Sequence, residues 1–139
     1  MSITFRYKKT VWLGNEERYV PMVPITLIGK EESFDTFGLL DSGADLSVLP
    51  KEVAEIIGVT IDEKTKEPIR GVSGNSNAFR SNISASINLG YERFNFKLPI
   101  MILEENSGIP VILGRQGFFE NFDITFKENK KKVIIKKSS

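Results

Sequence analysis

The spacing of turn residues constrains the fold of this chain more than any other feature of its sequence. Short runs rich in β-branched and aromatic residues alternate with clusters such as Asn15-Glu16-Glu17 and Gly29-Lys30-Glu31-Glu32. Runs bounded in this way indicate strands, and many short strands with few helices predict an all-β barrel or sandwich. Strands are expected over Ile3–Leu13, Arg18–Ile28, Ser33–Asp41, Leu46–Leu49, Phe94–Leu98, Ile100–Leu103, Ile109–Leu113, Asp123–Phe126 and Val133–Ile135. Ile69–Asn88 alternates loosely around the turn Gly71–Ser76 and is expected to be a hairpin.

Two short segments have helical patterns. In Pro50–Gly58 a proline stands near the start and a glycine just past the end, and both are typical of helix boundaries. Val53, Ile56 and Ile57 follow the spacing of one helix face, so we expect them to be buried. A second helix of one or two turns is expected within residues 115–121.

One acidic residue interrupts the apolar pattern. The stretch LLDSGADLSVLP, residues 39–50, carries Asp41 at the end of one apolar run and shortly before another. A carboxylate at the end of a buried strand is costly unless a partner satisfies it. Asp41 therefore either caps a turn, for which Asp, Ser and Gly are common residues, or has a chemical role.

Two residue types are absent from the 139-residue chain, and this narrows its chemistry. The sequence contains no cysteine and no histidine. Disulfides, thiolate nucleophiles, Ser-His-Asp triads and metal sites ligated by Cys or His are therefore excluded. Any catalysis has to use carboxylates, Lys, Tyr, Ser, Thr or backbone groups.

Length and charge give weaker bounds. The chain length fits one domain, 1–139, and a net charge of +1 gives no reason to expect a nucleic-acid partner. The basic segment 127–137 is interpreted as a solvated hairpin with charged edges, and nucleic-acid binding through this segment is a weaker alternative. No signal peptide and no membrane span is recognisable, and together with the lack of cysteine this leads us to expect a cytoplasmic protein without a membrane partner.

Three motifs in order along the chain carry a family resemblance. The first is the stretch around Asp-Ser-Gly-Ala, and the third is Val111-Ile112-Leu113-Gly114-Arg115 before a short helix. Between them lies a glycine-containing hairpin, Ile69–Phe79. Over about residues 37–121, these motifs resemble those of retropepsin-like aspartic proteases, in which a flap hairpin separates the Asp-Ser/Thr-Gly-Ala signature from an apolar-apolar-Gly-Arg segment.

The resemblance implies an all-β, closed-barrel-like acid-protease fold with one or two short helices, a flap hairpin and N-terminal strands, residues 1–32, as an extension. It also implies a homodimer, because the chain has a single Asp-Ser-Gly and the reaction needs two aspartates. The two Asp41 carboxylates would share one proton, activate a water and polarise the scissile carbonyl of a peptide substrate. The resemblance implies no cofactor and no metal.

The resemblance also assigns roles to individual residues. Ser42 would hydrogen-bond across the two turns, Gly43 would allow close backbone approach, and Ala44 would leave the cleft floor open. Asp45 and Arg115 would form a structural ion pair. A flap closing over an extended peptide would exclude water from the cleft. The expected cleft and flap residues are Asp45, Gly71, Val72, Ser73 and Gly74.

Two other interpretations stay open at the level of the sequence. Asp41-Ser42-Gly43 taken alone is typical of an ordinary β-turn. A non-catalytic peptide-binding or dimerisation module on the same fold is the alternative function, and peptide cleavage distinguishes it from an enzyme.

Overall fold

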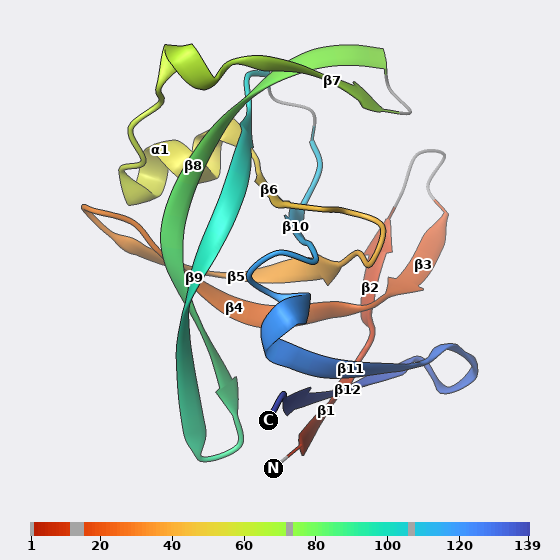
Figure 1. Ribbon diagram of the computed structural model, residues 1–139. Coiled ribbons are helices and arrows are strands. Elements are labelled where there is room, and N and C mark those ends of the chain that lie inside the picture. The colour runs from red at the N-terminus through yellow and green to blue at the C-terminus, as the bar shows by residue number, and fades with distance from the viewer. Residues whose placement is uncertain (1, 12–15, 72–73, 106–107) are drawn as a thin grey trace.

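The computed structural model describes residues 2–11, 16–71, 74–105 and 108–139 as a mostly β protein (Figure 1). No helix in these ranges is long and apolar enough to cross a bilayer. In chain order the elements, with η marking 3₁₀ helices, are β1 (Ser2–Arg6), β2 (Lys8–Val11), β3 (Glu17–Val20), β4 (Met22–Ile28), β5 (Ser33–Leu40), β6 (Ser47–Leu49), α1 (Lys51–Ile57), η1 (Glu63–Thr65), β7 (Glu67–Gly71), β8 (Gly74–Leu89), β9 (Glu92–Leu103), β10 (Val111–Leu113), η2 (Phe119–Asn121), β11 (Phe122–Lys127), η3 (Glu128–Lys130) and β12 (Lys132–Lys137).

Six of the described strands close into a barrel. Their order is β4-β5-β10-β6-β9-β8, and residues 26–28 of β4 close the ring by pairing with residues 84–86 of β8. β7 extends the sheet beyond β8. One cluster of buried apolar side chains forms the core; it comes from these six strands, α1, Tyr7 and the segment 118–135, and Leu27, Leu49 and Leu113 in it are fully excluded from solvent. The closed-barrel fold expected from the resemblance is confirmed.

β10 lies between β5 and β6, although it follows them by about sixty to seventy residues. It runs parallel to β5 and antiparallel to β6. Leu113 is opposite Leu40, so β10 and β5 end side by side. The segments that leave the two strands, beginning with Asp41 and with Gly114, are therefore neighbours.

Two segments expected as single strands are each split, so that expectation is wrong. The first breaks at Tyr7 and the second at Pro21. Tyr7 is buried and its N–H donates to the Lys131 carbonyl at 2.9 Å, which turns the chain at that point. Pro21 cannot donate a ladder hydrogen bond. Pro24 lies where β4 has only β5 as a described ladder partner.

The two ends of the chain form a second sheet, in which β12 lies between β1 and β11. β11 and β12 are the final hairpin that the sequence predicts. Ser2 is opposite Lys136, so the chain ends lie together (Figure 1). The segment 1–32, expected as an extension, thus contributes β1 to this sheet and β4 to the barrel. Among the described residues, its β2–β3 hairpin is the part that belongs to neither sheet.

The helix α1 has the expected boundaries but a rotated face. Pro50 is its N-cap, and Gly58 follows it with φ of 77°, a left-handed conformation that glycine adopts without steric penalty. Val53 and Ile57 are buried, whereas Ile56 is 42% exposed and Ala54 takes its place in the core. The i, i+3, i+4 and i, i+1, i+4 patterns differ by one residue, and only the packing decides between them. Within 115–121, the second expected helix is a turn followed by η2.

Candidate active site

Asp41 is the first residue after β5 and begins a tight turn. Its N–H donates to the Leu113 carbonyl at 3.0 Å, and its own carbonyl accepts from the Ala44 N–H at 3.2 Å. The carboxylate oxygen Oδ1 accepts from the Gly43 N–H at 2.9 Å. Backbone on both sides and the turn itself therefore hold the half-buried carboxyl group in one orientation.

The turn gives this carboxylate a hydrogen-bond donor without pairing it with a cation. Among the described residues, Asp41 takes part in none of the ion pairs, and the neighbouring Ser42 and Gly43 are exposed. A backbone N–H and partial access to water thus offset the cost of an acid after an apolar strand. The turn-capping and chemical interpretations are compatible, because one oxygen accepts the turn hydrogen bond while the carboxyl group stays partly open to solvent.

Residues 114–116, which we call the strap, run beside this turn and are tied to it. The Arg115 N–H donates to the Ala44 carbonyl at 2.8 Å, and the Gln116 N–H donates to the Asp45 carbonyl at 2.9 Å. The Gly114 N–H donates to Oγ of Ser47, a fully buried side chain, at 3.0 Å. The strap therefore fixes the turn through three backbone donors.

Two residues essential to this arrangement were not identified as site residues from the sequence. The signal available for Ser47 was a hydroxyl group within an apolar run, because a hydroxyl that is buried with such a run needs a hydrogen-bond partner. Gly114 is required by space, because a Cβ there would stand 2.6 Å from the Leu46 carbonyl oxygen and 2.8 Å from that of Ala44. Only a residue without a side chain lets the strap approach the turn this closely.

The structure brings Asp45 and Arg115 together. Arg115 Nη2 donates to Asp45 Oδ1 across 70 positions of sequence. Their side chains are 74% and 53% exposed, respectively, and an ion pair in water contributes little to stability. In the single chain, the hydrogen bonds of the strap rather than this ion pair fix the turn.

The hairpin between the two motifs is formed by β7 and β8. Gly71 is opposite Gly74, and the expected flap residues Val72 and Ser73 lie outside the described residues. At the base, Arg80 Nε donates to Glu67 at 2.8 Å and the Arg80 N–H donates to Thr65 Oγ1 at 3.0 Å. The hairpin is thus anchored at its base and, in Figure 1, extends along one end of the barrel.

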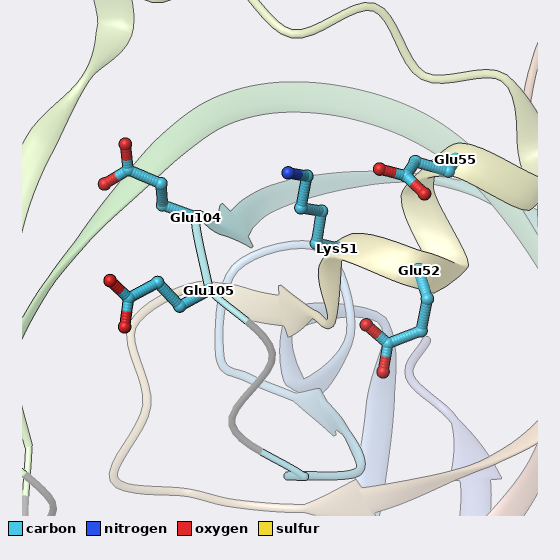
Figure 2. A pocket seen from close by; sticks show the side chains of 5 residues that line it. All are labelled: Lys51, Glu52, Glu55, Glu104 and Glu105. Atoms are coloured by element: carbon cyan, nitrogen blue, oxygen red, sulfur yellow. The ribbon is translucent and has the colours of Figure 1, made fainter.

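A separate depression, shown in Figure 2, lies where α1 begins and β9 ends. Asn77 and Lys66, at 2.9 and 3.1 Å, hold the Glu104 carboxylate and lower its pKa. Within the described part of the chain, no three potential ligands gather into a metal-binding group. The depression is an ionic surface away from the Asp41 turn. Its lining residues are Lys51, Glu52, Glu55, Glu104 and Glu105.

A barrel in which one strand ends in an Asp-Ser-Gly turn, with a Gly-Arg strap tied to that turn, defines the retropepsin-like class. Residues 24–116, which include both the turn and the strap, match the aspartyl protease family model. The chain therefore belongs to the aspartyl protease family.

A solved structure has the same fold as this chain. A retropepsin-like aspartic protease from Rickettsia conorii matches with a TM-score of 0.60 and 15% identity, over 97% of this chain and 88% of that one. EIAV protease complexed with the inhibitor HBY-793 matches with a TM-score of 0.47 and 22% identity, over 76% of this chain and 88% of that one. A search of curated proteins found no match. The Rickettsia structure shows that the fold extends over nearly the whole chain.

Proposed function

We propose that this protein is an aspartic endopeptidase that acts as a homodimer, with the Asp41 carboxylates of two chains as its catalytic pair. Membership of the aspartyl protease family and the retropepsin-like fold support peptide hydrolysis. The Asp41 turn carries the residue assignment. Its carboxylate is oriented by the Gly43 N–H, partly open to water and outside every ion pair of the described residues.

The need for a second copy follows from the chemistry. Hydrolysis by carboxyl groups requires a base that takes a proton from water and an acid that polarises the peptide carbonyl. Two adjacent carboxyl groups cannot both ionise, so one keeps its proton and the pair supplies both functions. Because the sequence has a single Asp-Ser-Gly, the second Asp41 comes from another copy related by two-fold symmetry.

In the proposed reaction, the ionised Asp41 takes a proton from water as the water oxygen bonds to the peptide carbonyl carbon. The protonated Asp41 of the other chain donates its proton to the carbonyl oxygen, which gives a tetrahedral diol. The C–N bond then breaks, a carboxyl group passes a proton to the leaving nitrogen, and the other recovers a proton from the diol. Neither chain holds one role permanently, because the pair titrates as a unit.

The β7–β8 hairpin is assigned the role of the flap in this proposal. Its anchored base at Arg80 and Glu67 and its glycines at the far end suit an element that closes over substrate. A peptide bound in extended form would lie between the hairpin and the Asp41 turn and hydrogen-bond to exposed strand edges. Ser42 and Asp45, both exposed on that turn, would then lie near the substrate and the partner chain.

Asp41→Asn tests the assignment, with Asp123→Asn as the matched control because Asp123 is an acid of β11 that contacts Ser138. We expect the first variant to stay folded and lose cleavage of a mixed peptide library, and the control to keep it. Parent activity in a folded Asp41→Asn protein contradicts the proposal. Absence of cleavage by the parent protein supports a non-catalytic module instead.

Mixing parent and Asp41→Asn chains tests the shared pair directly. If each active site needs two intact Asp41 residues, an equal mixture keeps about a quarter of the activity of the same total amount of parent protein, because only parent–parent pairs are active. If one chain is sufficient, the mixture keeps about half. Activity proportional to the amount of parent chain therefore rules out the shared pair.

A further inference from the structure

The β2–β3 hairpin, which we call the arm (residues 8–11 and 17–20), is built differently from the rest of the protein. Its strands pair with each other, Lys8 opposite Val20 and Val11 opposite Glu17, and with no other described strand. A two-stranded ribbon of this kind is marginally stable by itself in water. The arm therefore depends on what holds its base and on what covers its faces.

Both ends of the arm are fixed to the body of the protein. At the N-terminal end, buried Tyr7 donates its N–H to Lys131 and its hydroxyl to Glu128 at 3.2 Å. At the other end, the Pro21 carbonyl accepts from the Leu40 N–H at 2.9 Å. Leu40 directly precedes Asp41, so the arm leaves the body beside the Asp41 turn.

One face of the arm is turned toward the body. Lys8 Nζ lies 4.0 Å from the centroid of the Phe37 ring. Phe37 belongs to β5, the strand that leads into the Asp41 turn. The Thr10 hydroxyl oxygen, on the same face by strand alternation, is excluded from solvent. The alternate residues of each strand consequently point away from the body.

The outer face combines apolar and charged groups. Val11 is 65% exposed and Tyr19 is 51% exposed, although both are large apolar side chains. On the same face, Lys9 is opposite Tyr19 and Glu17 is opposite Val11, and Lys9 Nζ lies 3.0 Å from Glu17 Oε2. Figure 1 shows the arm on the side of the molecule toward which β5 ends.

We infer that the outer face of the arm, formed by Lys9, Val11, Glu17 and Tyr19, is a contact surface for a second copy of this chain. The inference rests on the proposed function, which requires two Asp41 turns to meet and therefore brings a second copy to the edge where the arm is anchored. Contact with the copy removes Val11 and Tyr19 from water. One cation and one anion on the face allow an approach to an identical protein without net like-charge repulsion.

The double variant Val11→Ser/Tyr19→Ser in the full chain tests this contact, with Tyr91→Ser as the matched control. Tyr91 is fully exposed at the turn between β8 and β9, outside the arm. Sedimentation equilibrium gives the dimer dissociation constant, and circular dichroism shows that each variant is folded. We expect the double variant to raise the dissociation constant by about tenfold or more, which corresponds to about 1.4 kcal/mol, and the control to leave it unchanged.

Peptide cleavage measured on the same samples separates the two proposals. If the arm contacts the second copy, the double variant loses specific activity on dilution and regains it at high protein concentration, with an unchanged KM. An unchanged dissociation constant together with a raised KM places substrate on the arm and overturns the inference. A parent protein that is monomeric at all concentrations also overturns it. A parent dimer that weakens as expected but cleaves no peptide supports the arm and refutes the proposed function.

Discussion

Replacement of Ser47 by alanine tests the idea that the strap fixes the Asp41 turn. Ser47 is fully buried, and its hydroxyl oxygen accepts from the Gly114 N–H, which is itself buried. Ser47→Ala leaves this backbone donor without a partner in a site that water does not reach. An unsatisfied buried donor costs about 1–3 kcal/mol, and we take about 2 kcal/mol for this one.

Ser86→Ala is the matched control, because the chain offers a second serine of almost equal burial. Ser86 is 1% exposed, and its hydroxyl accepts from Arg93 Nη2 at 2.8 Å. The Arg93 side chain is exposed, so water replaces the lost hydroxyl as its partner. The loss then approaches the net value of a hydrogen bond, about 1 kcal/mol or less.

Urea unfolding at a fixed protein concentration measures the two free energies, and equal m-values show that the unfolding transitions are comparable. We expect Ser47→Ala to lower the free energy of unfolding by about 1 kcal/mol more than Ser86→Ala does. At about 4 °C per kcal/mol for a chain of this size, the thermal midpoint of Ser47→Ala falls by about 8 °C. Equal losses in the two variants refute the reasoning, because the strap donor then has no special need of Ser47.

Two further predictions concern packing and pH. Gly114→Ala should be strongly destabilising, because the new Cβ would stand 2.6 Å from the Leu46 carbonyl oxygen. Gly108→Ala should cost only about 1–2 kcal/mol of backbone strain, because Gly108 has φ of 71° and its Cβ would meet no atom within 4 Å. Equal thermal midpoints for the two variants contradict this prediction. Burial, with help from Glu128, raises the pKa of Tyr7 above its usual 10.0, so folding favours the protonated phenol. This contribution to stability is complete below about pH 10 and is lost as pH rises through the raised pKa. The free energy of unfolding of the parent, measured with urea, should therefore fall above about pH 10 relative to that of Tyr7→Phe. Parallel profiles for the two proteins exclude the linkage.

Local sequence signals predicted the elements whose boundaries depend on their own residues. Pro50 and Gly58 mark α1, and the apolar run before Asp41 marks β5, because capping and strand patterns act over a few residues. The rotation of α1, which buries Ala54 instead of Ile56, depends on the surface against which the helix packs. No pattern within nine residues contains that information.

The site was predictable as a set of residue types but not as a set of contacts. Asp41 was identified by its motif, and Arg115 by a second motif. The hydrogen bond from the Gly114 N–H to the Ser47 hydroxyl, which joins the strap to β6, spans 67 positions and depends on β10 entering between β5 and β6. Likewise, β1 pairs with β12 from the other end of the sequence, and the Tyr7 N–H donates to the Lys131 carbonyl next to this pairing. Pairings between distant segments leave no periodic signal in either one.

β10 lies between β5 and β6, two strands that the ribosome synthesises much earlier, and this has a consequence for folding during synthesis. A ribosome that has released residues 1–100 has already exposed the whole Asp-Ser-Gly motif, yet the Leu113 carbonyl and the Gly114 and Arg115 N–H groups that fix it are still to come. Closing so long a loop is an entropically costly late event. The nascent chain therefore carries its motif in an unfixed state, and the Asp41 turn acquires its geometry only after residues 113–115 have left the ribosome.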